Sequence, residues 1–386
     1  MSDDPLNVRA EFPVTQHTTY LNNAALGPLS RTAHAAGLAF MDERMHDPWP
    51  DPPPTGLLRV RSLKQQVRTK FAQLYGADAS EVAVVESTSA GENIVAKALL
   101  KPGDSVVVDE LHFESSFLLY REMGKTHGIT LRIVPHRDGI TTVDDVAAYC
   151  DRTTKLISVS WVSNRNGYRA DVAALAQLAH SHGGYLYVDA IQAIGTFPAD
   201  LHALDIDFLT TGGYKWLYAN FGVSPFYVKK SLLPLIPSDR FGHTHVAGMS
   251  DEYRFTIKQD ASKYEYSAQA HTSTAQLNGA LDLLGRVGLD AIAAHAIPLA
   301  NYLWRELHDM GYRMFTPPDT QSAIVAFTHG IDVATLNQRM AHERIAILLR
   351  EGDVSLRTGV GFYNNRADID HFLNVMRDLR THRTSV

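Results

Sequence analysis

The chain has 386 residues, of which 45% are hydrophobic and 20% charged, and its formal net charge is −6. This composition indicates a folded protein with a large core, and the negative charge gives no sign of nucleic-acid binding. The single cysteine, Cys150, excludes a disulfide framework within the chain and a thiolate zinc cluster. No apolar signal segment follows the N-terminus, and no apolar run approaches the roughly 20 residues of a membrane span, so we expect a cytoplasmic protein.

The first half of the chain alternates strand and helix patterns. Residues 1–29 are expected to form an N-terminal arm that turns at Gly27-Pro28. Helices are predicted over about 30–46 and 59–75, with a proline-rich break at 48–54. Strands are then predicted to start at six positions, separated by helices: Val82, Ser105, Leu131, Leu156, Tyr185 and Asp207. The alternation predicts an α/β fold with a doubly wound, mostly parallel sheet.

The second half of the chain predicts a smaller α+β unit. The run 221–228 is expected to be a strand, and its proline favours antiparallel pairing or a sheet edge. Residues 237–270 are polar and rich in turn formers. Helices are predicted at 274–287, 292–310, 332–342 and 367–381, and strands at 323–327, 345–349 and 354–358. We therefore expect a large domain over 30–280 and a small C-terminal domain over 281–386.

Asp189 and Lys215 follow consecutive predicted strands, Tyr185 to Val188 and Asp207 to Thr211. Open α/β sheets bind ligands beyond the carboxyl ends of their strands, so we expect both side chains at one edge. Taken singly, Asp189 is typical of a helix N-cap and Lys215 of a solvated loop. Together they provide what a pyridine aldehyde cofactor needs: an amine for a Schiff base and a carboxylate for the ring nitrogen.

Three further strand ends carry candidate cofactor contacts. Thr88 and Ser89 stand at a strand-to-helix turn, where hydroxyls and free N–H groups suit a phosphate, although helix capping is their commoner use. Phe113 follows the strand that starts at Ser105, where its ring could cover a flat cofactor or simply join the core. Asn164 lies at the tip of the strand that starts at Leu156, where it could donate to a phenolic oxygen or shape a turn. No metal site is predicted.

The motifs Val188-Asp189-Ala190-Ile191-Gln192 and Gly213-Tyr214-Lys215 resemble those of the aminotransferase class V family. This group of fold-type I pyridoxal-phosphate enzymes includes cysteine desulfurases, kynureninase and isopenicillin N epimerase. The resemblance extends from about Tyr20 to the last helix. It implies pyridoxal 5′-phosphate as cofactor, a large domain with a smaller C-terminal one, and a homodimer with active sites at the subunit interface.

The resemblance also implies a role for each candidate residue. Lys215 would form the Schiff base with the cofactor and then move the substrate α-proton, and Asp189 would pair with the pyridinium nitrogen. Arg357 and Asn23 would bind the substrate carboxylate. The remaining contacts would surround the cofactor: Gln192 and Asn164 at the ring oxygen, Thr88, Ser89 and Tyr214 at the phosphate, and Phe113 stacked on the ring.

The chain departs from the family pattern in three places. The family's desulfurases carry a nucleophilic cysteine in the loop before the carboxylate-binding arginine, whereas 348–353 here contains none and Cys150 belongs to an earlier predicted helix. The Gly-Thr pair that relatives send to the partner's phosphate aligns near 267–268, where His271 or Thr272 could substitute. Arg165 stands where relatives carry an apolar residue, which indicates an unusual substrate or a charge-pairing role.

Without the desulfurase cysteine, we expect β-elimination from an S-substituted cysteine, a C–S lyase reaction of specialised metabolism that yields a thiol, pyruvate and ammonia. The first alternative is epimerisation, with a second proton donor among the Tyr or His residues of 241–271. Transamination or decarboxylation coupled to deamination comes next. A protein of another class also stays open: a regulatory binding protein without catalysis, or an α/β protein without the cofactor. The substrate cannot be named, because the loops 40–55 and 237–272, where specificity lies, contain no recognisable motif.

Overall fold

A computed structural model describes the chain except residues 1–3, 47–55, 251, 253, 350–354 and 382–386, so the proline-rich break lies outside the described residues. Its centre is a seven-stranded sheet in the order β2-β8-β7-β6-β5-β3-β4. These strands are β2 (Val82–Val85), β3 (Ser105–Asp109), β4 (Thr130–Val134), β5 (Thr154–Ser160), β6 (Tyr185–Asp189), β7 (Phe208–Thr210) and β8 (Ser224–Val228). β8 alone runs opposite to the rest, so the prediction of a mostly parallel sheet is confirmed.

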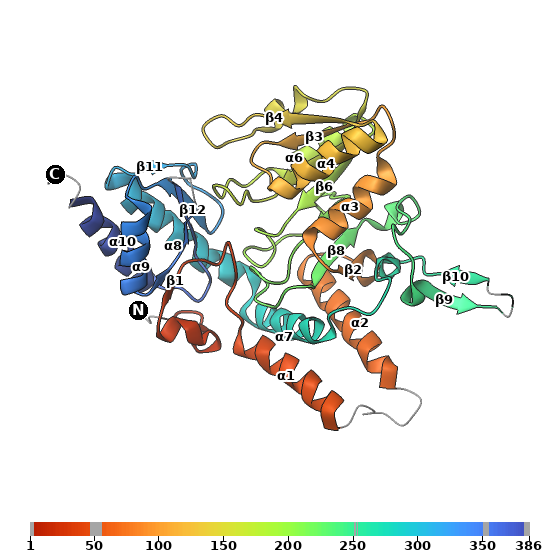
Figure 1. Cartoon of the computed structure of the whole chain (residues 1–386), viewed down its shortest axis with the longest axis horizontal. Helices are drawn as coiled ribbons and strands as arrows, with labels where there is room; N and C mark the ends of the chain where they lie inside the picture. The colour runs from red at the N-terminus through yellow and green to blue at the C-terminus, as the bar shows by residue number, and fades with distance from the viewer. Residues whose placement is uncertain (1–3, 47–55, 251, 253, 350–354, 382–386) are drawn as a thin grey trace.

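Helices cover both faces of this sheet, which is why its strands are almost continuously apolar (Figure 1). α3 (Thr88–Leu99) and α4 (Glu114–His127) pack on one face, and α5 (Val143–Ala147) and α6 (Val172–Ser181) on the other. Along β6, Leu186 and Val188 join the core under α6, whereas Tyr187 joins the core under α3. The alternation predicted from the sequence is therefore a doubly wound layer structure.

β8 is antiparallel as predicted, but it lies inside the sheet rather than at its edge. Pro225 is opposite Val84 on β2, and the polar groups of Val84 face outward. The Val84 N–H donates to Glu265 at 3.0 Å, and its C=O accepts from Gln269 at 2.7 Å. Pro225 therefore needs no N–H toward β2, and the edge of the sheet is covered by side chains from the 237–270 segment.

A second sheet of four strands lies at the other end of the molecule, in the order β11-β12-β15-β14 (Figure 1). It comprises β11 (Arg313–Met314), β12 (Ile324–Thr328), β14 (Leu348–Leu349) and β15 (Ser355–Gly359), and α8 (Leu289–Asp309), α9 (Val333–His342) and α10 (Arg366–Thr381) accompany it. The predicted strand 345–349 is split, because β13 (Ile345–Ala346) pairs instead with β1 (Thr19–Tyr20) of the arm. The predicted domain boundaries stay predictions.

Three helices, α1 (Arg31–His46), α2 (Gly56–Leu74) and α7 (His271–Val287), pack together below the large sheet (Figure 1). A hairpin of β9 (Val246–Met249) and β10 (Phe255–Ile257) projects from the segment that was expected to hold only turns. Within the described ranges, no single helix has the length and hydropathy of a membrane span. α7 and α8 meet the length and hydropathy criteria only when the two helices are treated as one segment, and they are bent by 81° where they join. Both helices contribute buried residues to the core.

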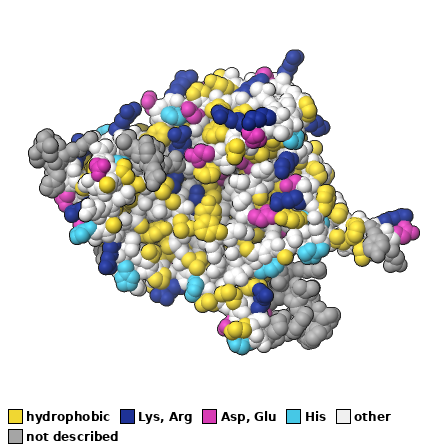
Figure 2. All heavy atoms as spheres, in the orientation of Figure 1, with side chains coloured by type: hydrophobic (Ala, Val, Ile, Leu, Met, Phe, Trp, Pro, Cys, Tyr) yellow, Lys and Arg dark blue, Asp and Glu magenta, His cyan; other side chains and the backbone are white. Residues whose placement is uncertain are grey.

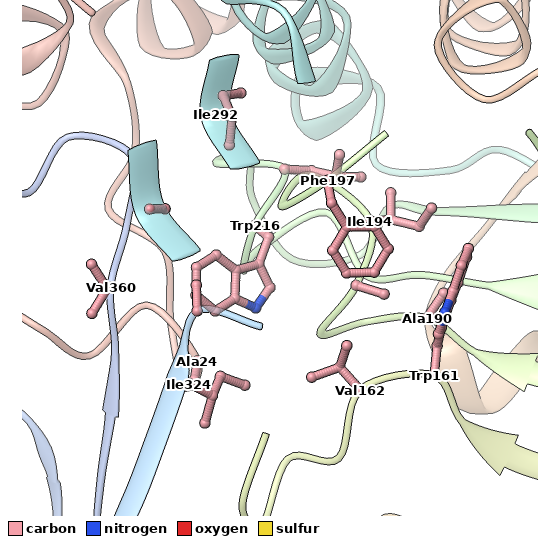
Figure 3. Close-up of a cluster of buried hydrophobic side chains, with 14 of the residues drawn as sticks. Ala24, Trp161, Val162, Ala190, Ile194, Phe197, Trp216, Ile292, Ile324 and Val360 are labelled. Carbon is pink, nitrogen blue, oxygen red and sulfur yellow. The ribbon is translucent and has the colours of Figure 1, made fainter. Parts of the chain in front are cut away.

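The arm and the two sheets meet around one indole ring. Trp216 is 2% exposed and packs in the main core. Figure 3 shows it among Ala24 of the arm, Ile324 and Val360 near the small sheet, and Phe197 and Ile194 near the large sheet. Since Trp216 directly follows Lys215, the packing of the two sheets fixes the chain on which that lysine stands.

Candidate active site

Asp189 and Lys215 are both buried at the carboxyl edge of the large sheet, with 6% and 7% exposure. Asp189 is the last residue of β6, and Lys215 stands in the turn after β7. Burial raises the pKa of the Asp189 carboxyl to about 6, although the Ile191 N–H, at 3.0 Å, and the charge of Lys215 oppose that rise. Burial thus outweighs the charge of Lys215, and a protonated ring nitrogen beside Asp189 would stabilise its carboxylate further.

Buried polar atoms without a hydrogen-bond partner lie on the elements around this pair. In the described part of the chain they include the Thr88 hydroxyl, Asn164 Oδ1 and Asn23 Nδ2. Asn164 is 4% exposed and Asn23 is fully buried. A buried polar group without a partner costs about 1–3 kcal/mol, so this arrangement favours a ligand that completes the bonds. A half-turn of the Asn164 amide would present its NH2 group instead of Oδ1.

The start of α3 leaves a hydroxyl uncommitted. Ser87 is the N-cap, and its side chain accepts from the Ala90 N–H at 3.1 Å. The capping role is therefore filled by Ser87, while Thr88 and Ser89 stand in the first turn, half-buried. The Tyr187 hydroxyl donates to the Thr88 carbonyl at 3.3 Å and ties this turn to β6. A helix N-terminus with a free hydroxyl suits a phosphate.

The N-terminal arm lies directly against the lysine. The Gly27 N–H donates to the Tyr214 carbonyl at 2.9 Å. A Cβ atom on Gly27 would lie 1.9 Å from the Lys215 carbonyl oxygen, so only glycine fits here. Gln192 fastens the same arm, because its amide donates to the Ala24 carbonyl at 2.9 Å and accepts from the Trp216 indole at 2.7 Å.

Gln192 therefore has one amide hydrogen left for the predicted contact with the ring oxygen. That contact stays a prediction, and the structure assigns the side chain a second task, the attachment of the arm. Tyr214 is half-buried and its ring stacks on Phe221, with centroids 4.5 Å apart. Phe113 is 41% exposed at the start of α4, so its ring is not part of the core. The cofactor roles of Tyr214 and Phe113 stay predictions.

Arg357 brings the small sheet to the site. It stands on β15, is 6% exposed, and its guanidinium donates to the Asn164 carbonyl in the loop after β5. Asn23 lies on the same side, because Leu21 and Asn22 of the arm run beside Gly359, two residues beyond Arg357. The Asn23 side chain accepts from the Tyr363 hydroxyl at 3.1 Å. A held guanidinium and an amide suit a carboxylate.

Arg165 lies next to Asn164 and is half-buried. Its guanidinium donates to the Glu110 carbonyl at 3.3 Å, at the end of β3. Within the described residues no carboxylate forms an ion pair with it. The charge-pairing role considered for Arg165 therefore finds no protein partner in the described chain.

Sequence reasoning placed Gly27 in a turn but missed its contact with Lys215, and it missed Trp216 and Glu92 altogether. Gly27 and Trp216 act through contacts between segments far apart in the chain, which carry no local signal. Glu92 is the one acid of α3, the other buried residues of this helix are apolar, and Glu92 is 3% exposed. That polar residue on a buried helix face was the signal that could have found it.

The fold and the paired amine and carboxylate define a class: α/β proteins that bind a pyridine aldehyde at the strand ends. Residues 59–372 match the family model for aminotransferase class-V. The chain belongs to this family, which consists of pyridoxal-phosphate enzymes, and it has the fold-type I architecture.

Similar proteins include a cysteine desulfurase of Dickeya dadantii (strain 3937), 26% identical over 397 residues that cover 95% of this chain and 94% of that one. Among solved structures, the cysteine desulfurase CsdA of Escherichia coli has a TM-score of 0.86 and 24% identity over 97% of this chain and 98% of that one. The cystine C–S lyase C-DES, solved with its product cysteine persulfide, has a TM-score of 0.87 and 21% identity over 95% and 99% of the two chains.

The residues present fit pyridoxal phosphate, the cofactor of this enzyme. The Lys215 amine can bond to its aldehyde, and a protonated ring nitrogen would stabilise the buried carboxylate of Asp189. The unpartnered Thr88 hydroxyl suits its phosphate, and the unpartnered Asn164 amide suits its ring oxygen. The residue roles beyond this fit stay predictions.

Proposed function

We propose that the protein is a C–S lyase that eliminates the sulfur substituent from an S-substituted cysteine. The reaction takes up one water and releases a thiol, pyruvate and ammonium, so no oxidant or reductant is needed. When bound, pyridoxal phosphate supplies an electron sink for negative charge at the substrate Cα. The observation that carries the proposal is the position of the one cysteine.

Cys150 is on the wrong side of the large sheet for a nucleophile. It follows α5 and precedes β5, at the amino end of that strand, whereas Asp189 and Lys215 lie beyond the carboxyl ends. Seven residues of strand separate the two edges by about 20 Å. Burial raises the pKa of the Cys150 thiol, which keeps it protonated and unreactive.

A mechanism that passes sulfur to an enzyme cysteine therefore has no candidate nucleophile in this chain. The stretch 348–353, where related desulfurases place theirs, lies partly outside the described residues, but its sequence holds no cysteine. Elimination needs no such nucleophile. The resemblance to C-DES, described as a cystine C–S lyase, supports this choice.

The chain's own residues would divide the work as follows. Arg357, held by the Asn164 carbonyl, and Asn23 bind the substrate carboxylate and fix its orientation. Lys215 takes the α-proton, and Asp189 keeps its negative charge at the ring nitrogen. Burial of Asp189 and Lys215 keeps bulk water from the groups that carry charge.

The test is to incubate the purified holoenzyme with L-cystine, an S-alkylcysteine and free L-cysteine, and to follow thiol, pyruvate and ammonia. Cys150→Ser should release all three at the wild-type rate, and Lys215→Ala should release none. Loss of release in Cys150→Ser would instead indicate sulfur transfer through the enzyme.

The alternative reactions have distinct signatures in the same assay. Solvent deuterium at Cα without thiol release would indicate the epimerase that we ranked second. Transfer of the amino group to an added keto acid would indicate a transaminase, and release of carbon dioxide a decarboxylating deaminase. Any of these outcomes would overturn the lyase proposal and leave the cofactor assignment intact.

We also propose a homodimer in the cytoplasm. Support comes from apolar side chains that stay exposed over α1 and the β9–β10 hairpin, visible at the lower and right edges of the face in Figure 2. On α1 these are Leu38, Met41 and Met45, and on the hairpin Met249 and Phe255. Exposed apolar patches mark contact surfaces. Light scattering of the holoenzyme gives the mass of the particle, and a monomer would refute the proposal.

A further inference from the structure

A cavity of about 680 Å³ lies apart from the cofactor site. Three segments line it: the chain that leads from β5 into α6, the loop that follows β6, and the turn 317–321 between β11 and β12. In the described chain, none of the residues that we assign to the cofactor or to the substrate is part of this lining. Cavities of roughly 300–1,000 Å³ are typical of small-molecule sites, so this one has room for a ligand of that kind.

Hydrogen bonds hold the walls of this cavity in place. The Ala170 N–H donates to the Trp161 carbonyl at 2.8 Å, which closes the base of the loop 161–170. The Thr320 and Ser322 hydroxyls donate to the Gly167 carbonyl of the same loop, at 3.2 Å and 2.7 Å. The cavity is therefore formed before a ligand enters, and binding there requires little ordering of the chain.

Arg169 places a positive charge in the wall of the cavity. It is half-buried, and its guanidinium carbon lies 3.7 Å from the centroid of the Phe197 ring. Phe197 in turn contacts Trp161 edge to face, with ring centroids 5.4 Å apart (Figure 3). Arg169 belongs to the lining and Phe197 does not. The guanidinium therefore lies between the phenyl ring and the cavity, and the ring covers only one of its faces.

The guanidinium of Arg169 has no carboxylate to neutralise it. Among the residues that the structure describes, no acid forms an ion pair with it and no carbonyl accepts a hydrogen bond from it. Burial lowers its pKa, and no nearby carboxylate opposes that fall. A cation–π contact leaves the N–H donors in the plane of the guanidinium unused. Their fork matches a carboxylate, so Arg169 can bind the carboxylate of a ligand.

Three aspartates stand in the same lining: Asp171, Asp200 and Asp319. Asp171 and Asp200 each accept one backbone N–H through Oδ1, at 3.0 Å and 2.9 Å, so each has its Oδ2 left for a ligand. No lysine, arginine or histidine of the described ranges forms an ion pair with any of the three. One positive and three negative side chains thus line the cavity, a balance that favours a ligand of net positive charge.

We propose that the cavity is a second binding site, which takes a free amino acid with a positively charged side chain. Asp171 stands two residues after Arg169, so the two side chains hold the neighbouring ammonium and carboxylate of one α-amino acid. Asp200 and Asp319 come from the other two segments and receive the cation at the far end of the ligand. The ring of Tyr168 and the prolines of the lining pack against its methylene stem. This inference depends neither on the cofactor nor on the proposed reaction.

Calorimetry with L-arginine as the probe tests the proposal. The purified protein is first treated with borohydride, so that a bound cofactor aldehyde cannot react with an added amine. We expect one site per chain. L-Citrulline has the same shape without the side-chain charge, and agmatine lacks the carboxylate, so each should bind roughly tenfold or more weakly than L-arginine.

Variants locate the site. Arg169→Gln removes the cation, and Asp171→Asn removes one anion while asparagine still caps α6. Each should weaken L-arginine binding by roughly tenfold or more. Arg121→Gln, at an exposed position of α4, is the matched control, and Arg357→Gln separates this site from the substrate site. Both of these proteins should bind L-arginine like the wild type.

The following results would overturn the proposal. Absence of binding would exclude the site, and equal binding of L-citrulline or agmatine would exclude the ligand class. Unchanged binding in Arg169→Gln or Asp171→Asn, or loss of binding in Arg357→Gln, would place the ligand elsewhere. If Arg169→Gln does not fold, Ala203→Trp gives a second test. Ala203 is an exposed residue of the lining, so an indole there should fill the cavity, and L-arginine binding that persists would refute the proposal.

Discussion

Replacing Gly27 by alanine should disturb the cofactor site from the N-terminal arm. The new Cβ would lie 1.9 Å from the Lys215 carbonyl oxygen, and ordinary contacts begin at 3.4 Å. One of the two backbones must therefore retreat by about 1.5 Å. The bond from the Gly27 N–H to Tyr214, now 2.9 Å, would then break.

Overpacking costs about 1–3 kcal/mol, and the lost hydrogen bond costs about 1 kcal/mol. We expect a total of about 2–4 kcal/mol and, for a chain of 386 residues, a fall in Tm of roughly 2–5 °C. The assay is thermal unfolding of the cofactor-free protein, followed by titration with pyridoxal phosphate. Cofactor binding should weaken as well, because the displaced backbone carries the lysine.

Gly285→Ala is the matched control. Gly285 lies inside α7, and its new Cβ would meet Leu74 at 3.9 Å, an ordinary contact. Alanine in a helix interior is more stable than glycine by about 0.5–1 kcal/mol, so this variant should melt higher. A Gly27→Ala protein that melts with the wild type and binds cofactor normally would refute the close packing of arm and lysine.

Three further variants test other parts of the structure. Gln192→Leu leaves a buried carbonyl and a buried indole N–H without partners, so it should cost about 2–5 kcal/mol in denaturant unfolding, whereas Gln65→Leu on the exposed face of α2 should change stability little. Arg9→Ala removes the 2.7 Å ion pair with Asp368 and should cost about 1–3 kcal/mol, a loss that shrinks at high salt. Burial raises the pKa of Asp109 to about 7, so Asp109→Asn should melt higher than the wild type above that pH and equally below about pH 4. An unchanged unfolding curve would contradict the expectation for Gln192→Leu, and a loss of stability that does not depend on salt would contradict that for Arg9→Ala. For Asp109→Asn, the contradicting result is a Tm difference from the wild type that is the same at every pH.

The sequence predicted the layers of the fold because period and composition are local. Strands that are flanked by turns and alternate with helices predict a doubly wound sheet, even when the tertiary contacts between their side chains are unknown. The position of Pro225 could not be predicted, because it depends on Glu265 and Gln269, which bond to the backbone of Val84 from 181 and 185 residues away in the chain. The β9–β10 hairpin was missed because its strands are only four and three residues long and do not show the alternation of buried and exposed residues over enough positions to mark a strand.

For the site, the residues at strand ends could be predicted and their supports could not. Asp189 and Lys215 follow strands, and topology alone brings strand ends together. Gly27 and Trp216 depend on how the arm and the small sheet pack against that edge, which is set by long-range contacts. Glu92 did have a local signal, an acid on a helix whose other buried residues are apolar, but its depth of burial follows from the packing of α3 against the sheet.

The central claim is that Lys215 holds pyridoxal phosphate with its ring nitrogen at Asp189. The direct test is to reduce the holoenzyme with borohydride, digest it and locate the pyridoxyl group by mass spectrometry. We predict one modified lysine, Lys215, and none in Lys215→Ala. A pyridoxyl group on another lysine, or a protein that stays unlabelled and colourless with excess cofactor, would contradict the account.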